Sequence, residues 1–370
     1  MGGLLISILL AFILQTQNPQ SADFQKAVSL QQQGKLEEAA AAYRALISRQ
    51  PENAEAYANL GVVLGRLGKT DEAISAYEAA LKANPSLIPV LLNAGILHFR
   101  TGNYERAVDE LDRFLKVYPG HPQARQLLGL SLIEIGYNTA GIGQLEPVLA
   151  EGPPDPGVLY SLGLAYIRTN RLADAEGMIG KLKGLGQGEA LSHLLRGQLL
   201  LFKFEFEAAV TELKQAQSIN PGLPKLHYSL GLCYFKLALN KEALAEFREE
   251  FKQQPKDFTT IYYLATLLEA GDELEEARKF ADQAYSMQSE SVEVITLLGK
   301  VMSRQGRNEE AAKLIEQAVA KDPKDSVKHY LLGKIYRELG RREASNKEFN
   351  EARRLKAEET QTDREKGIKP

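Results

Sequence analysis

Five histidines and one cysteine are the side chains of this 370-residue chain that are most suited to metal binding or nucleophilic catalysis. The histidines, at positions 98, 121, 193, 227 and 329, show no close pairing of the kind that metal ligands need. Cys233 stands among apolar neighbours in LGLCYF with no base at hand, so we expect it to be a small buried hydrophobe. These residues therefore predict no metal site, no cofactor and no enzymatic activity.

Two short patterns invite a reading as phosphate or acid–base sites, and both favour a simpler explanation. The glycine-rich GLGQG at residues 184–188 has no strand before it and no Lys-Ser/Thr after it, so we expect a linker loop. The carboxylates of EFREEFK and DELEEAR are expected on solvated outer faces of helices. The formal net charge is −3 with both signs interspersed, which disfavours nucleic acid as a partner. No small-molecule substrate is evident.

A glycine inside an apparently helical segment reveals the elements that carry these residues. Gly61 lies in NLGVVLGRLG, where a helix-interior glycine costs about 0.5–1 kcal/mol relative to alanine. The same position recurs every 34 residues, as Ala27, Gly61, Gly95, Gly129, Gly163, Gly197, Gly231, Ala265, Gly299 and Gly333. Ten copies without an insertion run from residue 20 to about residue 359. A fixed period of this length is typical of stacked repeats.

Other columns of the repeat keep step with this one, which is numbered position 8. Position 20 is small in every copy, positions 11 and 24 are mostly large, position 15 is often Gly and position 32 is Pro in seven copies. We interpret each copy as two antiparallel helices that cross closely where positions 8 and 20 are small. Gly at position 15 is expected to end the first helix, and Thr70 or Asp71 to cap a second one. Three histidines share position 4 and are expected to be partly buried neutral rings: His193, His227 and His329.

The second copy, AEAYANLGVVLGRLGKTDEAISAYEAALKANP, resembles the tetratricopeptide repeat almost throughout. The resemblance implies an all-α fold, a right-handed superhelical solenoid of antiparallel helix pairs. We expect ten repeats, at residues 20–53, 54–87, 88–121, 122–155, 156–189, 190–223, 224–257, 258–291, 292–325 and 326–357, and a polar tail at 358–370.

The ends and the middle of the array depart from the pattern. Asp23 and Lys26 replace apolar residues in the first copy, as expected of a solvent-facing end. The fourth and fifth copies are rich in Gly and Pro, so we expect shortened helices between residues 141 and 190. After Arg354 the chain becomes polar and is expected to fray.

The resemblance also implies a concave groove lined by the first helices, to which positions 2, 5, 6, 9, 12 and 13 contribute. Here these columns carry an apolar stripe across repeats three to eight with basic residues along one border, a pattern typical of a partner site. The expected partner-binding residues are Asn59, Asn93, Arg66, Arg100, Leu92, Phe99, Leu130, Ile133, Tyr160, Leu164, Ile167, Arg168, Tyr228, Leu232, Phe235 and Lys236; the same columns add Ile96, Leu194, Leu201, Tyr262 and Arg304. Alternatively, many of the apolar residues pack between neighbouring first helices. The family's Asn ladder at position 6 lapses after Asn93, and no three successive copies supply its clamp for chaperone tails.

The N-terminal residues predict export. Leu4 to Leu14 form an apolar run that is short for a membrane span and has the length of a signal-peptide core. We expect residues 1–19 to be a signal peptide, cleaved between Gln15 and Ala22, or else an uncleaved anchor; an apolar helix folded onto the first repeat is a further alternative. The expected location is periplasmic or extracellular, with inner-membrane anchoring as the alternative and membrane contact confined to this segment.

The sequence thus predicts a non-catalytic scaffold or adaptor of a bacterial-type cell envelope, which binds a protein partner as a peptide or amphipathic helix in its groove. One alternative is a membrane-tethered assembly factor for secretion, pilus or polysaccharide export. Another is a regulatory subunit of a separate catalytic partner such as a glycosyltransferase. A cytoplasmic co-chaperone is opposed by the missing clamp and by the leader.

Overall fold

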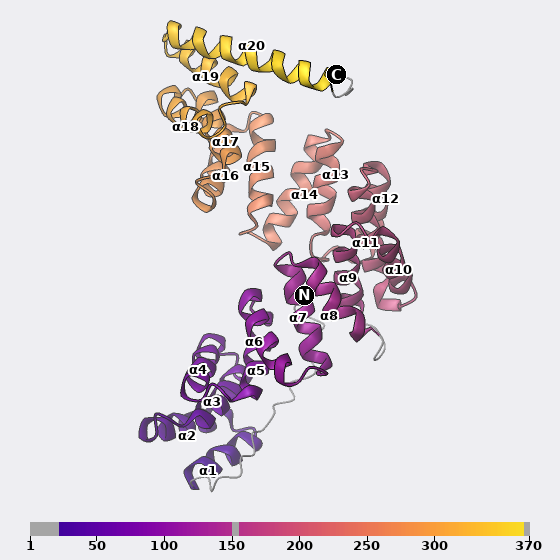
Figure 1. Cartoon of the computed structure of the whole chain (residues 1–370), viewed down its shortest axis with the longest axis vertical. Coiled ribbons are helices and arrows are strands. Elements are labelled where there is room, and N and C mark those ends of the chain that lie inside the picture. The colour runs from indigo at the N-terminus through magenta and orange to yellow at the C-terminus, as the bar shows by residue number, and fades with distance from the viewer. Residues whose placement is uncertain (1–21, 150–154, 366–370) are drawn as a thin grey trace. The chain divides into compact units, whose positions relative to one another are not determined.

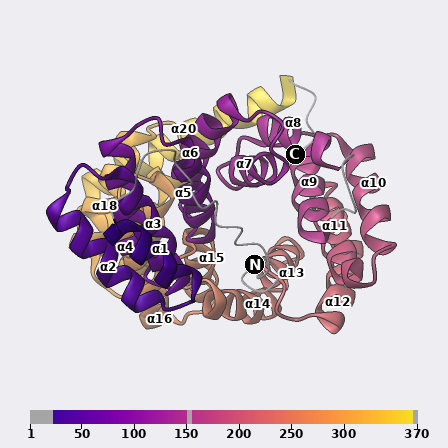
Figure 2. The same cartoon turned by 90° about the horizontal axis from the view of Figure 1, so that it is seen from below.

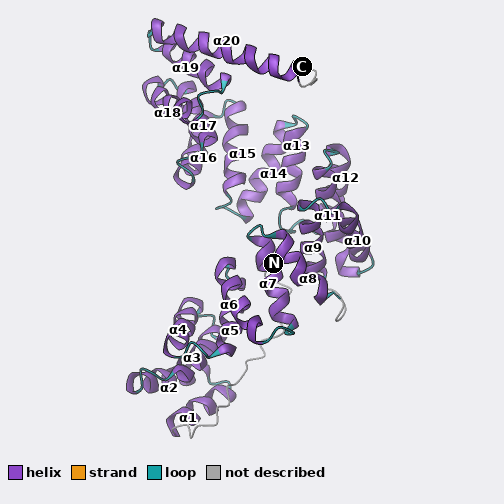
Figure 3. Ribbon diagram, viewed as in Figure 1, coloured by secondary structure: helices purple, strands orange, loops and turns teal. Residues whose placement is uncertain are grey.

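The computed structural model describes residues 22–149 and 155–365 of the chain. Over these two stretches the backbone forms twenty α-helices and one 3-10 turn, and no strand (Figure 3). The expected leader and its cleavage site before Ala22 lie outside the described residues. Within each compact unit, every helix packs on the next one along the chain (Figures 1 and 2). The prediction of an all-α fold built from antiparallel helix pairs is confirmed.

The helices alternate regularly, and the chain divides into two compact units, Met1–Phe202 and Lys203–Pro370. The first helices of the pairs are α1 (Ala22–Gln32), α3 (Ala54–Arg66), α5 (Ile88–Arg100), α7 (Pro122–Glu134), α9 (Pro156–Arg168), α11 (Glu189–Phe202), α13 (Leu226–Lys236), α15 (Phe258–Ala270), α17 (Val292–Arg304) and α19 (Ser326–Glu338). The second helices are α2 (Leu36–Arg49), α4 (Thr70–Ala83), α6 (Tyr104–Val117), α8 (Asn138–Val148), α10 (Leu172–Lys183), α12 (Phe206–Ile219), α14 (Asn240–Gln253), α16 (Leu274–Met287), α18 (Asn308–Lys321) and α20 (Arg342–Glu365). The unit boundary falls inside the sixth repeat, so α11 belongs to the first unit and α12 to the second.

The glycine at position 8 makes room for one large side chain of the second helix. A Cβ atom on Gly61 would lie 2.5 Å from Cε1 of Tyr77, which occupies position 24 of the same repeat. The position-24 side chains of the third, fourth, seventh, ninth and tenth repeats fill the same space over their glycines. Gly163 differs, because the side chain nearest to its missing Cβ is Leu195 of the following first helix. The two helices cross closely, as expected from the small residues, because a ring or branched side chain of the second helix packs directly against the glycine backbone of the first.

Position 15 reverses the chain in a left-handed backbone conformation in all ten repeats. Six of these residues are the expected glycines, such as Gly68 with φ of 75°. The other four are Asn170, Phe204, Ala238 and Asp272, with φ between 57° and 65°. The turn lets the N–H of position 16 donate to the carbonyl of position 11, as Lys69 does to Leu64 at 2.9 Å. Position 15 thus ends the first helix whether or not it is glycine.

The caps differ from the prediction. α4 already includes Thr70 and Asp71, and its N-cap is Lys69, whose side chain makes no capping bond, so neither expected residue caps it. A single residue, Lys69, separates the left-handed Gly68 from the start of α4, so Lys69 takes the N-cap position and Thr70 and Asp71 lie inside the helix. Side-chain caps occur instead on first helices, at Asn53, His121, Asp155, Asp257, Ser291 and Asp325.

The middle and the ends of the array follow the sequence only in part. α8 has 11 residues and α10 has 12, against 14 in the other second helices up to α18, so the expected shortening is confirmed. The GLGQG segment is a 3-10 turn over Gly186–Gly188 between α10 and α11, as expected of a linker loop. Asp23 and Lys26 are exposed on α1, and Asp23 pairs with Arg49 at 2.8 Å.

The expectation that the chain frays after Arg354 is wrong for the described residues. α20 is one helix of 24 residues that runs from Arg342 past Arg354 to Glu365. The stretch KAEETQTDRE has no Gly or Pro and is rich in strong helix formers. Arg354 pairs with Glu358 at 2.5 Å and Lys356 with Glu359 at 3.1 Å along the same helix, which favours continuation. Polarity alone therefore did not end this helix.

Candidate partner-binding site

The first unit buries part of the expected groove. Asn59, Leu92, Ile133, Tyr160 and Ile167 are all buried, as is Leu194 from the same columns. Asn59 donates its amide to the carbonyl of Glu55 at 3.0 Å, one turn earlier on the same helix. Ile133 is 2 % exposed and lies against the backbone of Gly141 on α8. These side chains are therefore buried within the fold rather than exposed on a groove surface.

A narrower set of first-unit residues reaches solvent. Ile96, Leu130 and Leu164 occupy position 9 of three consecutive repeats and are half-buried, and so is Phe99. Arg66, Arg100 and Arg168 are exposed at position 13, one helical turn further along the same face. Glu134 occupies that position on α7, so the border is not uniformly basic. The position-9 aliphatics and their charged border form what we call the α5–α9 face, defined by Ile96, Phe99, Arg100, Leu130, Leu164 and Arg168; half-buried Asn93 also lies on α5.

In the second unit, the expected groove residues are committed to aromatic packing. Tyr228, Leu232, Phe235 and Tyr262 are half-buried, whereas Lys236 is exposed. The ring of Phe235 lies 5.1 Å from that of Tyr263 on the following first helix. Tyr263 also stacks on Phe247 at 4.9 Å, and Tyr228 approaches Phe247 at 6.0 Å. The contacts of Tyr263 with Phe235 and Phe247 join the seventh repeat to the eighth.

Arginine at position 13 also braces adjacent repeats. Arg168 donates from Nη1 to the carbonyl of Ile133 at 3.4 Å, and Arg304 donates to the carbonyl of Glu269, which is again the position-12 carbonyl of the preceding repeat. Arg304 pairs with the Glu269 carboxylate at 2.7 Å, and Lys300 pairs with it at 2.7 Å. Since the Glu269 side chain is 3 % exposed, two cations compensate a buried charge there. The sequence predicts these basic residues as the border of a partner site and does not predict the contacts between repeats.

Polar pairs between repeats recur at fixed spacing, and sequence reasoning missed them. Position 25 of one repeat pairs with position 19 of the next in Arg44–Glu72 (2.5 Å) and Arg248–Glu276 (2.7 Å). Position 11 donates its tyrosine hydroxyl to position 25 of the preceding repeat in Tyr166–Glu146 and Tyr336–Glu316, both at 2.9 Å. Position 16 pairs with position 18 of the preceding repeat in Lys69–Glu37 and Arg341–Glu309. The signal was available as opposite charges recurring 28 or 32 residues apart.

The histidines at position 4 pair with glutamates of the second helix in their own repeat. His227 Nδ1 lies 2.6 Å from Glu246, and His329 Nδ1 lies 2.6 Å from Glu348. The hydrogen bond to Glu246 raises the pKa of His227 above its ordinary value, because it favours the charged ring. This shift favours the charged ring, whereas the sequence predicts a neutral one. Both pairs hold the first helix to the second.

His98 and Glu110 form a different pair in the third repeat. Both are buried, with His98 Nε2 3.6 Å from Glu110 Oε1. Burial raises the pKa of Glu110 to about 8, with nearby Asp109 adding to the effect. Burial also lowers the pKa of His98. Both shifts favour the uncharged forms of the two groups, because burial disfavours a charge on either of them.

The expectation of solvated carboxylates in EFREEFK is wrong for two of them, since Glu246 is partly buried against His227 and Glu250 is buried. Glu250 is 1 % exposed and accepts the backbone N–H of Tyr228 at 3.1 Å. Burial raises its pKa, against the opposing effect of Lys225. Cys233 is buried, and burial raises its pKa to about 12, so the prediction of a small buried hydrophobe is confirmed.

The described residues contain neither a metal-binding cluster nor a membrane-spanning helix. In residues 22–149 and 155–365, no three His, Cys, Asp or Glu side chains are arranged so that they could hold a metal ion. Among the described helices, none combines the length and apolar character needed to cross a bilayer.

Comparison with known proteins identifies the family. Tetratricopeptide repeat models match residues 24–88, residues 66–130 and 267–335, and residues 329–358, together more than half of the chain. No curated protein sequence matches the chain. Among solved structures, a monomeric IFIT1 mutant with m7Gppp-AAAA aligns over 90% of both chains with a TM-score of 0.50 at 16% identity. "MamA RS-1 ArsTM double mutant" covers 46% of this chain and 96% of its own with a TM-score of 0.43 at 19% identity. At such identities the likeness concerns the fold alone. The helix pairs, the large side chains packed on the position-8 glycines and the matching family models all agree, so the chain belongs to the tetratricopeptide repeat family.

Proposed function

We propose that this protein is a non-catalytic scaffold that holds a protein partner on the α5–α9 face of its first unit. The observation that carries the proposal is the row of half-buried aliphatic side chains at position 9 of three consecutive repeats, with Arg100 and Arg168 beside it. An extended peptide or an amphipathic helix buries apolar side chains against such a row, and acidic flanks pair with the arginines. The face is a binding surface for chains rather than a pocket for a small molecule.

The second unit supports the choice of the first. Its position-9 residues are Leu232, Thr266, Lys300 and Lys334, so they form no row of aliphatic side chains. In the first unit, Leu130 and Leu164 remain half-buried after the repeats have packed. Completing their burial by a partner contributes roughly 25 cal/mol per Å² of apolar surface.

A double variant tests the site. Leu130→Asp with Leu164→Asp places two charges on the α5–α9 face and is expected to abolish capture of the partner by the full chain. Ile133→Asp is unsuitable, because Ile133 is buried and its loss damages the fold. Val117→Asp is the matched control, since Val117 is 51 % exposed at the end of α6 in the same unit.

Photocrosslinking in the producing cell reads out the result. With benzoyl-phenylalanine at position 99, we expect a crosslink to a protein partner. This crosslink should be lost in the variant that also carries Leu130→Asp and Leu164→Asp. Helical circular dichroism of the double variant should match the unmodified chain. Crosslinking from position 117 but not from position 99 would place the partner elsewhere and refute the proposal.

We further propose that the protein works in the cell envelope, supported by the apolar run Leu4 to Leu14. Fractionation and N-terminal sequencing test this location. A mature N-terminus between residues 15 and 22 in the soluble envelope fraction is the expected result. A chain that retains residue 1 and stays with carbonate-washed membranes favours the tethered assembly factor instead.

A further inference from the structure

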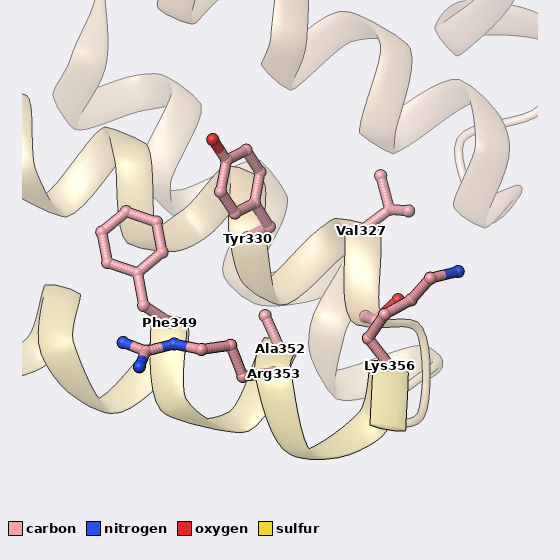
Figure 4. Close-up of a pocket in the computed structure, with 7 residues that line it drawn as sticks. Val327, Tyr330, Phe349, Ala352, Arg353 and Lys356 are labelled. Atoms are coloured by element: carbon pink, nitrogen blue, oxygen red, sulfur yellow. The ribbon is translucent and has the colours of Figure 1, made fainter. Parts of the chain in front are cut away.

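The last repeat presents an apolar surface at the end of the array. α20 is the final helix of the described chain, and α19 and α20 form a pocket of about 490 Å³ between them (Figure 4). Val327 and Tyr330 line it from α19 and are 67 % and 55 % exposed. Phe349, Ala352, Arg353 and Lys356 line it from α20. We call this surface the α19–α20 face. Other large apolar side chains are equally exposed, such as Tyr137 and Phe204, but Val327 and Tyr330 line one pocket together, which indicates an unfilled contact.

An internal repeat shows what covers such a surface in this chain. In the seventh repeat the residues corresponding to Tyr330 and Phe349 are Tyr228 and Phe247, whose rings approach at 6.0 Å. Tyr330 and Phe349 keep the same arrangement at 5.5 Å. In the seventh repeat, the next first helix, α15, lies over the pair, and its Tyr263 stacks on Phe247 at 4.9 Å with the rings 5° from parallel. The α19–α20 face thus repeats a surface that receives a helix bearing an aromatic side chain.

The charges distinguish this face from its internal counterpart. Position 27 is buried Glu250 in the seventh repeat and Ala352 in the tenth. Positions 28 and 31 are Phe251 and Gln254 in the seventh repeat, and they become Arg353 and Lys356 in the tenth. The end face is therefore an apolar pocket with two cations beside it. Lys356 already pairs with Glu359 at 3.1 Å, so Arg353 in particular favours an acidic partner.

We propose that the α19–α20 face docks an amphipathic α-helix of a partner protein in the place of an eleventh first helix. An aromatic residue of that helix lies on Phe349, its apolar neighbours cover Val327 and Tyr330, and acidic residues pair with Arg353 and Lys356. This site is separate from the α5–α9 face, so one scaffold holds two partners or two segments of one partner.

Other occupants fit less well. α1 of a second copy would offer the exposed polar residues Gln25, Lys26 and Ser29 to an apolar face. Two copies meeting by their α19–α20 faces would bring Arg353 and Lys356 of one near the same cations of the other, which is unfavourable.

The test uses the full chain and a peptide of α15, residues 258–270, stapled to hold it helical and labelled for fluorescence anisotropy. A second version carries an added Glu-Glu-Glu segment. Both are expected to bind the unmodified chain, and Tyr330→Glu is expected to weaken binding at least tenfold. Because Tyr330 is 55 % exposed, that change should lower the thermal melt only slightly, through loss of the ring contact with Phe349. Tyr137→Glu, at a residue 65 % exposed elsewhere, is the matched control and should not change binding. A peptide with Tyr263→Asp should not bind.

The charge component has its own measurement. Arg353→Glu with Lys356→Glu should weaken binding of the Glu-tagged peptide about fivefold or more. Binding of the untagged peptide should weaken by less than twofold. Equal binding by Tyr330→Glu and the unmodified chain would overturn the proposal, and so would the absence of binding. A dimer of the unmodified chain that Tyr330→Glu dissociates would overturn it in favour of a second copy as the occupant.

Discussion

At the scale of single residues, the fold depends on a glycine whose missing side chain leaves space for a large side chain of the neighbouring helix. Gly61, Gly95 and Gly299 each lie under a different type of position-24 side chain: Tyr77, Leu111 and Ile315. The column tolerates this variety because only bare backbone is required beneath the large group. A glycine elsewhere in the same helix has no such role.

Two alanine substitutions within α3 separate these cases. Gly61→Ala places a Cβ 2.5 Å from the Tyr77 ring and is expected to destabilise the protein by about 1–3 kcal/mol. Gly65→Ala meets nothing within 4 Å and should stabilise it by about 0.5–1 kcal/mol through helix propensity. Urea denaturation followed by circular dichroism measures both. Equal effects of the two changes would show that packing on Gly61 is unimportant.

The buried carboxyl of Glu110 makes stability depend on pH. Its folded pKa of about 8 lies above the ordinary value, so the folded state binds the proton more tightly than the unfolded state. Its contribution is therefore most favourable below about pH 4.5 and is lost as pH rises toward 8. Glu110→Gln removes this loss and is expected to stabilise the protein at pH 9, by on the order of 3 kcal/mol, with little change at pH 5. Unfolding midpoints of both proteins at the two pH values give the answer. A difference that is the same at pH 5 and pH 9 would contradict a raised pKa.

At the scale of elements, the turn within each repeat is conserved in geometry although not in residue type. All ten position-15 residues have positive φ, including Phe204 and Ala238. A left-handed conformation costs a non-glycine residue roughly 1–2 kcal/mol. The N–H of position 16 still reaches the position-11 carbonyl, as Leu239 does to Tyr234 at 2.9 Å. Packing of the two helices imposes the turn where the residue does not favour it.

Exchanging the residue at this turn should change stability in opposite directions in two repeats. Ala238→Gly relieves the left-handed strain and is expected to stabilise by about 0.5–1 kcal/mol, after the greater freedom of glycine in the unfolded chain is counted. Gly102→Ala introduces the strain at φ of 76° and should destabilise by about 1 kcal/mol. Denaturant midpoints with unchanged slopes provide the measurement. If both changes destabilise, strain at position 238 is not what limits that turn.

At the scale of the whole molecule, contacts are local along the chain. Each helix packs on its neighbours one or two places away within its unit, as in α13–α14, α14–α15 and α15–α17. Such arrays behave as sums of repeats and their interfaces. A group of complete repeats therefore has the contacts it needs without the rest of the chain.

Truncation tests this locality. A fragment of residues 224–365, which contains α13 to α20 as complete pairs, is expected to be as helical per residue as the full chain and to melt cooperatively. A fragment of residues 240–365 leaves α14 without α13 and uncovers buried Phe247, so it should be less stable by several kcal/mol. Circular dichroism melts of the two fragments decide, and an unfolded 224–365 fragment would show that longer-range contacts are required.

The sequence by itself determined the repeat, its phase and the helix pairs, because small and large residues at positions 8, 20 and 24 recur within one copy and pack inside that copy. It also predicted the shortened α8 and α10, since Gly and Pro act on the local backbone. Only the tertiary structure decided which groove positions stay open: Leu130 is half-buried and Ile133 is buried, three residues apart on one helix. The same applies to Glu110, Glu250 and Glu269, whose burial is set by neighbouring helices rather than by their own sequence context. Whether a side chain is exposed depends on the helices packed around it, and the apolar side chains that stay uncovered are where we propose that a partner binds.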